Sequence, residues 1–317
     1  IAFNALPATF TADMWAHQYD QQVNQVQCTI NPEHMWSTNG PESNIFGLEP
    51  NYGCCTANLH QGWPKFAAHL WMRSPDGGLA AMAYAPSTAR FQVRGQSVRV
   101  TLDTDYPFRD TLRLVVATER PVRFPIVLRV PGWTQGGSVR VGAGPEKPLE
   151  AGSFHRLMRE WKGSTGVEVR FPMSVKTTRR YNQAVALERG PLVYALKLGE
   201  TWTRVNADKP HRELPHGDFE VRPSTPWNYG LLVDEDRPET SVTFEQQPVG
   251  EKPFAPEGAG TIARVKGRRL PGWKLERGWA QEIPPGTQTS GEPLEDLTLV
   301  PYGCTRIRIA EFPRLTT

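Results

Sequence analysis

Regular alternation of apolar and polar residues beyond position 73 is the feature that most constrains how this chain can fold. It occurs in residues 89–94, 97–102, 111–116 and 166–171, and turn-forming Pro, Asp and Gly residues separate these segments. Such alternation is the period of strands that bury one face. Short strands that recur about every ten to fifteen residues predict a β-sandwich over residues 74–200.

The remaining C-terminal sequence predicts a second, smaller β-domain. Residues 201–218 are rich in Pro, His and charged residues, a composition that favours a linker. Strand-like segments follow it, among them 241–244, 261–265 and 305–309. We therefore expect a linker at 201–218 and a separate β-domain over 219–317.

The first 73 residues have a helical pattern near their end. Leu59, Trp63, Phe66 and Leu70 are spaced like the apolar stripe of a helix over about residues 56–72. Pro64 does not fit this helix, because proline removes a backbone hydrogen bond inside one. The sequence thus predicts a helix that is kinked, or that starts anew, at Pro64.

Cys54 and Cys55 stand side by side at the N-terminal end of this predicted helix, in a chain with four cysteines in all. Adjacent cysteines can form only a strained disulfide. Two neighbouring thiolates suit a soft metal better, usually Zn²⁺, and a helix N-terminus favours the thiolate form. On local sequence alone, two small buried hydrophobic residues are an equally good interpretation.

Five motifs occur along the chain: NALP at 4–7, GCCTAN at 53–58, YPF at 106–108, LRVPGW at 128–133 and ERGPLVY at 188–194. Their order is that of the β-L-arabinofuranosidases, a family of retaining glycoside hydrolases, and the chain resembles the C-terminal half of that family. The resemblance implies a mainly β fold, with two β-sandwich domains preceded by the last helical part of an (α/α)6 barrel at residues 1–73.

The resemblance also implies a mechanism in which a zinc-bound thiolate attacks the sugar. Cys54 matches the family's nucleophile and Cys55 matches a permanent zinc ligand. The family's acid/base glutamate and its Glu-x-Cys zinc ligands lie upstream of the double cysteine, and this sequence contains no Glu-x-Cys. We therefore expect the C-terminal part of a longer polypeptide, inactive alone unless another chain or a homodimer supplies the helical half.

Other residues offer alternatives that the sequence leaves open. A zinc site within the chain could combine Cys28 with Cys54 and Cys55, with or without a histidine. Glu49 lies in the loop before the cysteines and Trp227 lies in a later loop, so both are candidates for substrate binding. The histidines of the same N-terminal segment are His17, which is also a candidate for substrate binding, His34 and His60.

Composition limits the other classes of function. With 36 basic and 33 acidic residues, the charge balance argues against nucleic acid or another acidic polymer as the main partner. No run of eighteen apolar residues occurs, so we expect no membrane span. The partner that the family resemblance implies is an oligosaccharide or glycoside. Ten Trp residues keep open a non-catalytic carbohydrate-binding or structural β-sandwich module. The cellular compartment, cytoplasmic or periplasmic or secreted, stays undetermined, because a chain without its native N-terminus does not report on targeting.

Overall fold

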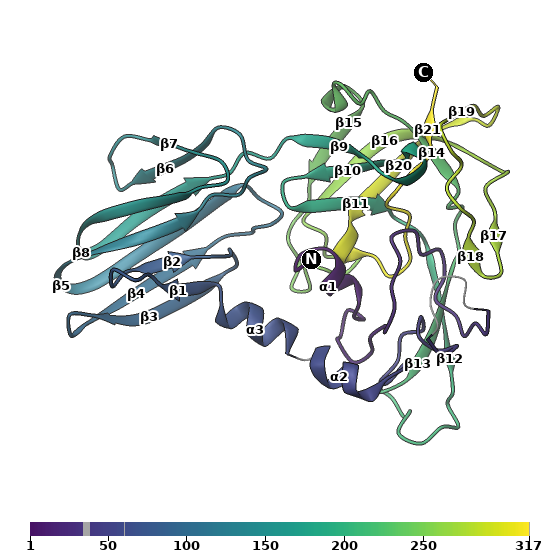
Figure 1. Ribbon diagram of the computed structural model, residues 1–317, viewed down its shortest axis with the longest axis horizontal. Coiled ribbons are helices and arrows are strands. Elements are labelled where there is room, and N and C mark those ends of the chain that lie inside the picture. The colour runs from purple at the N-terminus through teal and green to yellow at the C-terminus, as the bar shows by residue number, and fades with distance from the viewer. Residues whose placement is uncertain (34–38, 60, 317) are drawn as a thin grey trace. The chain divides into compact units, whose positions relative to one another are not determined.

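The computed structural model describes residues 1–33, 39–59 and 61–316, and it divides the chain into two compact units (Figure 1). Unit 1 comprises residues 1–60 and 175–317, and unit 2 comprises residues 61–174. Among the described residues, no helix is long and apolar enough to cross a membrane. The expected mainly β fold is confirmed in both units.

Unit 2 is an eight-stranded sheet that follows one short helix, α3 (Gly62–Ala68). The sheet order is β1-β2-β5-β8-β6-β7, while β4 pairs with β5 and β3 pairs with β4. The pairing of β2 with β5 is parallel and the others are antiparallel. The strands are β1 (Trp71–Arg73), β2 (Leu79–Ala81), β3 (Ser87–Val93), β4 (Gln96–Asp103), β5 (Thr111–Arg129), β6 (Gly137–Val141), β7 (Lys147–Leu149) and β8 (Phe154–Arg170).

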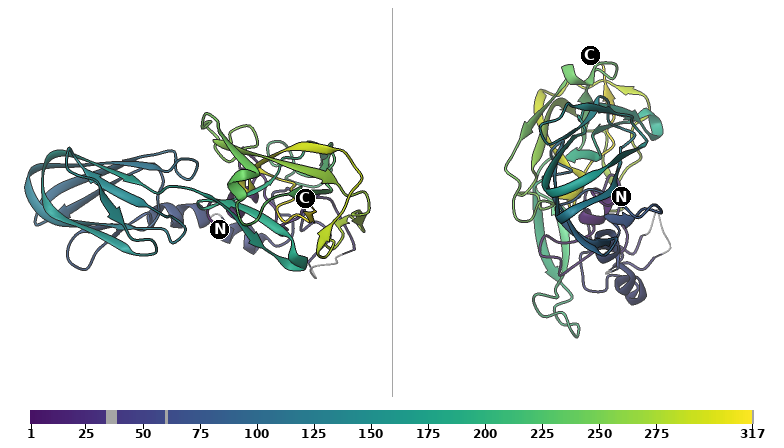
Figure 2. Two further views of the ribbon diagram at one scale, coloured as in Figure 1. Left: turned by 90° about the horizontal axis from the view of Figure 1, so that it is seen from above. Right: turned by 90° about the vertical axis from the view of Figure 1, so that its left-hand side faces the viewer.

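Two long strands make unit 2 curl around its core. The register of β5 against β8 shifts between Thr118 and Val122, so the two halves of each strand belong to different parts of the sheet. The ring of Phe91 in β3 then lies edge-on to Phe124 in the second half of β5, with 5.5 Å between centroids. Figure 2 shows the strands of unit 2 wrapped around this buried interior. The predicted strands at 89–94, 97–102, 111–116 and 166–171 correspond to β3, β4, β5 and β8.

Unit 1 is built on a nine-stranded sheet and two small two-stranded sheets. The large sheet runs β19-β21-β14-β16-β20-β11-β10-β9, with β15 added beside β16. Its strands are β9 (Val175–Arg179), β10 (Val185–Arg189), β11 (Leu192–Leu196), β14 (Tyr229–Leu232), β15 (Val242–Gln246), β16 (Thr261–Arg269), β19 (Thr287–Gln288), β20 (Leu294–Pro301) and β21 (Arg314–Leu315). The small sheets pair β12 (Glu200–Val205) with β13 (Asp218–Pro223), and β17 (Leu275–Glu276) with β18 (Trp279–Ala280).

The N-terminal segment is part of unit 1 rather than a separate helical layer. In its described part, α-helix is confined to α1 (Ala5–Ala8) and α2 (Gly53–Leu59), together with α3 in unit 2. Single backbone bridges join the rest of the segment to β13, at Cys28 with Val221 and at Phe46 with Phe219. The described residues of 1–59 are therefore mostly loops and turns, and bridges to β13 hold part of them against unit 1.

The unit boundaries differ from the expected ones because two segments join the sheets of unit 1. Residues 175–200, expected in the first sandwich, supply β9, β10 and β11 to the large sheet. Residues 201–218, expected as a linker, form most of β12 and the loop to β13. The predicted helix over 56–72 divides into α2 and α3, and Pro64 lies in the first turn of α3, where the missing N–H costs nothing.

One predicted strand is absent for a clear physical reason. Residues 305–309 alternate polar and apolar side chains, yet Arg306 and Arg308 are buried together with their apolar neighbours. Arg308 is 0% exposed, lies 4.5 Å from the ring of Tyr302 and donates to the Gln22 carbonyl at 2.7 Å. The guanidinium groups therefore hold the N-terminal segment in place, and the alternation does not mark a solvent-facing edge.

Candidate functional site

The two adjacent cysteines lie at the start of α2 with their side chains together. Cys54 and Cys55 have sulfur atoms 3.8 Å apart, and both are free thiols. Cys54 is exposed, whereas Cys55 is half-buried. The Tyr52 carbonyl accepts hydrogen bonds from the backbone N–H groups of Cys55 and Thr56, at 3.1 and 3.3 Å. The first turn of α2 thus leaves one thiol accessible and directs the other toward the protein.

Cys55 is held by a tyrosine that the sequence analysis did not identify. Its sulfur lies 3.7 Å from the hydroxyl oxygen of Tyr19, and the Tyr19 ring meets Tyr52 edge-on at 5.5 Å. The hydrogen bond with Cys55, followed by burial, raises the pKa of the Tyr19 phenol above its ordinary value. A phenol that keeps its proton can donate to a thiolate at this position. No local motif marks Tyr19, because the contact spans 36 positions of the chain.

Glu49 lies beside the beginning of α2. A β-carbon built on Gly53 would lie 3.5 Å from a carboxylate oxygen of Glu49, so this carboxylate is next to the residue that precedes Cys54. The side chain is exposed. The prediction that Glu49 approaches a substrate stays a prediction, and the structure places the residue where it could do so.

The other two candidates for substrate binding have packing partners. His17 is 5% exposed, its Nδ1 lies 3.1 Å from the Gly47 carbonyl, and its ring packs 6.3 Å from that of Phe10. Trp227 is half-buried and meets the Trp273 ring edge-on at 5.0 Å. These contacts account for both side chains without a ligand, and their roles in substrate binding stay predictions.

Cys28 belongs to a separate buried network. Gln18 and Gln25 donate to its sulfur at 3.2 and 3.1 Å, and burial raises the pKa of the thiol to about 12. Within residues 1–33, 39–59 and 61–316, no group of three His, Cys, Asp or Glu side chains is arranged to hold a metal. The proposed combination of Cys28 with Cys54 and Cys55 is therefore not formed by the described residues. His34 and His60, considered with it, lie outside them.

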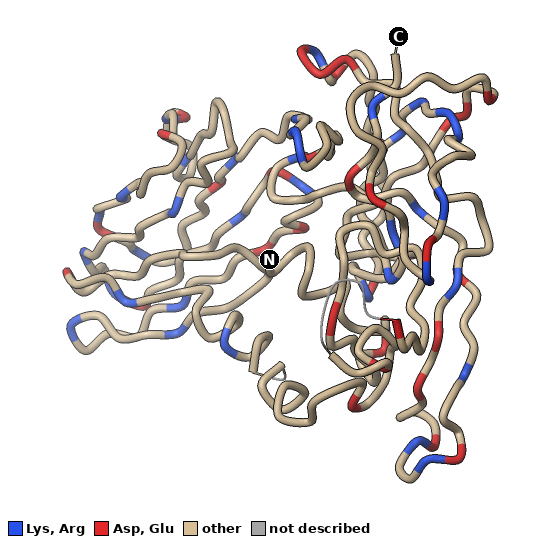
Figure 3. The backbone as a smooth tube through the Cα atoms, turned by 45° about the vertical axis from the view of Figure 1, so that its right-hand side comes forward, with Lys and Arg blue, Asp and Glu red and all other residues tan. Residues whose placement is uncertain are grey.

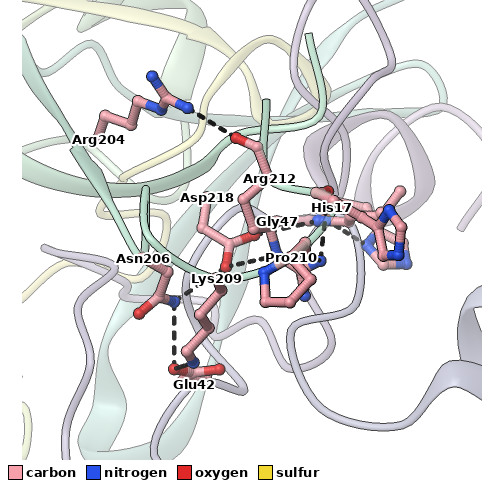
Figure 4. Close-up of polar contacts among 11 residues, drawn as sticks. His17, Glu42, Gly47, Arg204, Asn206, Lys209, Pro210, Arg212 and Asp218 are labelled. Carbon is pink, nitrogen blue, oxygen red and sulfur yellow. Dashed lines mark hydrogen bonds and ion pairs between the residues drawn. The ribbon is translucent and has the colours of Figure 1, made fainter. Parts of the chain in front are cut away.

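A cluster of ionic and polar side chains around the buried Asp218 contacts the segment that leads to the cysteines (Figure 4). Asp218, 2% exposed, accepts hydrogen bonds from Arg212 at 3.0 Å, from Asn206 at 2.9 Å and from the Leu48 N–H at 3.4 Å. Glu42 accepts from Lys209 at 2.6 Å and from Asn206 at 3.2 Å. The β12–β13 loop is thereby tied to residues 42–48.

Gly47 marks how closely the two segments approach each other. A β-carbon built there would lie 2.4 Å from Asp218 Oδ1, a separation that no side chain could accept. The composition of 201–218 favours a linker, but composition does not show which residues the charged side chains contact. The described cluster instead gives the loop a role in holding the chain just before Glu49 and Cys54.

The geometry of the sulfur pair suits a tetrahedral metal. With zinc–sulfur bonds of about 2.3 Å, two thiolates at neighbouring corners of a tetrahedron stand about 3.8 Å apart. The sulfur atoms of Cys54 and Cys55 have this separation, which is far longer than a disulfide bond. The two cysteines could therefore hold a zinc ion together with two further donors, and the Cys54 side chain is exposed.

A protein-family model matches part of the chain. The model of the β-L-arabinofuranosidase GH127 middle domain matches residues 78–173, which is most of unit 2. No curated protein shows significant sequence similarity to the chain.

Solved structures share the fold over nearly the whole chain. A GH127 β-L-arabinofuranosidase from Geobacillus stearothermophilus T6 is 19% identical, with a TM-score of 0.61, and the match covers 99% of this chain and 45% of that one. A glycoside hydrolase is 16% identical, with a TM-score of 0.67, and the match covers 100% of this chain and 47% of that one. A GH127 β-arabinofuranosidase is 15% identical, with a TM-score of 0.58, and the match covers 99% of this chain and 44% of that one. The chain spans slightly less than half the length of these proteins. Residues 78–173 thus resemble the GH127 β-L-arabinofuranosidase middle domain, and the chain shares its fold with GH127 structures.

Proposed function

We propose that this chain is part of a retaining glycoside hydrolase that acts on β-L-arabinofuranosides, with Cys54 as its nucleophile. The observation that carries the proposal is the exposed Cys54 thiol, 3.8 Å from the sulfur of Cys55, in a chain that contains a GH127 middle domain. A retaining mechanism needs a nucleophile on one side of the glycosidic bond and an acid on the other. A thiolate can fill the first role as well as a carboxylate can.

The chain's own residues would divide the work at the sulfur pair. Cys55, held by Tyr19, would remain a fixed ligand, while Cys54 would attack the anomeric carbon. The new bond joins that carbon to the Cys54 sulfur, the bond to the leaving oxygen breaks, and an acid gives its proton to that oxygen. Water then releases the sugar and restores the thiolate. Glu49, whose carboxylate lies beside Gly53 at the start of α2, would accept a hydrogen bond from a sugar hydroxyl.

The acid/base glutamate and two further zinc donors are proposed to come from sequence upstream of Ile1 or from another chain. Bound to Cys54 and Cys55, zinc would keep the thiol deprotonated at neutral pH. The sequence contains no Glu-x-Cys, so these donors are not supplied in the family's pattern by the 317 residues. The substrate, an arabinofuranoside, and the helical half are likewise proposals that the family resemblance supports.

Metal content and turnover test the proposal together. We would measure zinc per molecule by elemental analysis for this chain and for a longer polypeptide that includes upstream sequence, and assay both with p-nitrophenyl β-L-arabinofuranoside. We expect about one zinc and turnover in the longer protein alone. Zinc in the 317-residue chain would show that its own residues complete the site. A longer protein that hydrolyses the substrate without zinc would contradict the thiolate mechanism.

A further inference from the structure

Unit 2 carries an excess of positive charge that the composition of the whole chain conceals. Residues 61–174 contain 16 Lys and Arg residues against 9 Asp and Glu residues, whereas the totals for the chain are 36 and 33. Figure 3 shows basic positions recurring along the strands of this unit. The near balance that argued against an acidic partner therefore holds for the chain as a whole and not for unit 2.

Three of these arginines line one cavity of about 270 Å³ on unit 2. Arg73 ends β1, Arg94 lies in the turn after β3, and Arg123 lies in β5. Arg73 donates to the Gln92 carbonyl at 2.7 Å, while neither the Arg94 nor the Arg123 side chain has a hydrogen bond or ion pair with a described residue. Two guanidinium groups thus reach the cavity with their donors unused.

The one acidic side chain of the cavity is already engaged. Asp76 pairs with Arg156 through Oδ2 and accepts a hydrogen bond from Ser74 at Oδ1, so both carboxylate oxygens have partners other than the three lining arginines. Its turn is pressed against β5, since a β-carbon on Gly78 would lie 2.1 Å from the Pro125 carbonyl oxygen. The cavity wall is therefore fixed by the backbone, and the net charge of its lining is positive.

Arg94 occupies a backbone position that costs free energy. Arg94 and Gly95 form the two-residue turn between β3 and β4, with φ of 48° and 78°. A turn with both φ values positive favours Asn-Gly or Gly-Gly, because a bulky side chain is strained in the left-handed region. Such strain is found most often at binding and catalytic sites. Here it brings a long cationic side chain to the rim of the cavity.

Part of the cavity lining is apolar. Phe124, Pro125 and Met158 belong to it, and Met158 is 40% exposed. A lining that combines apolar surface with guanidinium groups suits a ligand with one hydrocarbon face and one anionic group. A sugar ring with a carboxylate has both, and the planar guanidinium matches a carboxylate through paired hydrogen bonds.

We propose that this cavity, lined by Arg73, Arg94 and Arg123, binds a uronic acid residue of an acidic glycan. The assignment of an anion follows from the three arginines, and the choice of a sugar rests in part on the proposed glycosidase function. Single-stranded nucleic acid is a poorer fit, because its binding platforms combine basic grooves with exposed aromatic rings and the lining offers only the buried Phe124. The middle domain then serves to hold the glycan that carries the scissile sugar.

Calorimetric titration with a hexamer of galacturonic acid tests the site directly. The fully methyl-esterified hexamer keeps the sugar rings and removes the charge, so it separates carboxylate recognition from sugar stacking. We expect saturable binding of the acid hexamer and binding of the ester at least about tenfold weaker, as expected from loss of charge-assisted hydrogen bonds. Inorganic phosphate and a single-stranded oligonucleotide serve as the competing anions. Either one binding as tightly as the acid hexamer would overturn the assignment.

Variants locate the site on unit 2. Arg94→Gln combined with Arg123→Gln should weaken binding of the acid hexamer about 10- to 100-fold. The matched control is Arg90→Gln combined with Arg99→Gln, which also removes two positive charges, here from the β3–β4 hairpin outside the cavity, and it should change the affinity less than about threefold. Arg94→Lys combined with Arg123→Lys keeps the two charges but loses the planar guanidinium groups. The affinity of this variant for the acid hexamer should therefore lie between that of the cavity glutamine variant and that of the control.

The outcomes remain informative if the proposed glycosidase function fails. The titration needs no turnover, and the Cys54→Ala protein should bind the acid hexamer as tightly as the unmodified chain. All four substituted arginines are exposed, and near-ultraviolet circular dichroism confirms that each variant is folded. Equal loss of affinity in the cavity variant and the hairpin control would reduce the effect to general electrostatics and contradict a site at the cavity.

Discussion

Asp218 and Arg212 form an ion pair whose two side chains are almost completely shielded from water. The Arg212 Nε lies 3.0 Å from Asp218 Oδ2, with 13% and 3% of the two side chains exposed. The other ion pairs described in unit 1 are more open, and exposed pairs contribute little to stability. Because the same carboxylate accepts from the Leu48 N–H, the pair connects the β12–β13 loop to the chain that leads to the cysteines.

Replacing Asp218 with Asn should therefore destabilise unit 1. The change leaves the Arg212 charge buried without its partner, which costs about 3 kcal/mol of the free energy of unfolding. Urea denaturation followed by tryptophan fluorescence measures this cost. Asp236→Asn removes the same charge from an exposed loop and should change the free energy of unfolding by less than about 0.5 kcal/mol. A similar small effect at Asp218 would mean that water reaches the pair.

Substitutions of the two cysteines should separate nucleophile from ligand. In a polypeptide that shows turnover, Cys54→Ala should lower kcat by more than about 1000-fold, because the attacking atom is lost. Cys55→Ala should lower both kcat and the zinc content, since it removes a donor from the site. Elemental analysis beside steady-state kinetics distinguishes these results. Activity close to the unmodified level in the Cys54→Ala protein would exclude Cys54 as the nucleophile.

Tyr19→Phe examines the contact that holds Cys55. Without the phenol oxygen 3.7 Å from its sulfur, Cys55 loses a hydrogen-bond partner while Tyr52 keeps its aromatic neighbour. In the longer polypeptide, we expect the affinity for zinc to fall about 10-fold, in the range found when a group that supports a metal ligand is removed. Competition with a chromogenic chelator gives the affinity. Tyr181→Phe, at an exposed tyrosine of unit 1 outside this site, is the control and should leave the affinity unchanged.

Much of the β architecture can be predicted from the sequence because alternation reports burial of one face. Val98, Val100 and Leu102 alternate with exposed or half-exposed residues in β4, and the prediction of a strand there is confirmed. The same rule fails at Arg306 and Arg308, where long-range contacts bury the charged residues as well. The motif at residues 53–58 identifies Cys54 and Cys55 from sequence alone, and their sulfur atoms lie 3.8 Å apart. Tyr19 and Asp218 could not be found this way, since their partners are distant in the chain.

Domain boundaries were less predictable than strands. Whether residues 175–200 belong to the first or second β-domain depends on which edge strands they meet, and β11 meets β20 more than a hundred residues later. The β12–β13 loop has the composition of a linker, yet Lys209 and Arg212 are paired with Glu42 and Asp218. Local composition describes neither pairing.

The buried thiol of Cys28 should make unit 1 sensitive to alkaline pH. Burial raises the pKa of this thiol from 9.0 to about 12. A folded-state pKa above the unfolded value means that the folded state retains a proton that the unfolded state has lost. The stability contributed by the neutral thiol is thus fully present below pH 9 and is lost as the pH rises from 9 toward 12, by up to about 1.4 kcal/mol per pH unit.

Cys28→Ser tests this dependence, because a hydroxyl can accept the same hydrogen bonds from Gln18 and Gln25 without titrating in that range. Urea midpoints between pH 9 and 11 should fall less steeply for the variant than for the unmodified chain. Cys304 also has a pKa raised to about 12 by burial and stays in both proteins, so some alkaline loss of stability remains. Identical slopes would mean that Cys28 is not protected from ionisation by its surroundings.

Arg94→Asn should stabilise unit 2 while removing an arginine from the cavity. Arg94 has a φ of 48°, and asparagine adopts the left-handed region more readily than residues with long side chains. We expect the free energy of unfolding to increase by about 0.5 to 1 kcal/mol, a part of the usual cost of such strain. Arg94→Ala also removes the guanidinium but keeps an unfavourable side chain in the turn, so it should give no comparable gain. Thermal unfolding of both variants measures the difference, and an Asn variant less stable than the Ala variant would show that the turn does not strain Arg94. Since both should bind the galacturonic acid hexamer more weakly, a gain in stability together with a loss of binding would explain why a strained arginine occupies the turn.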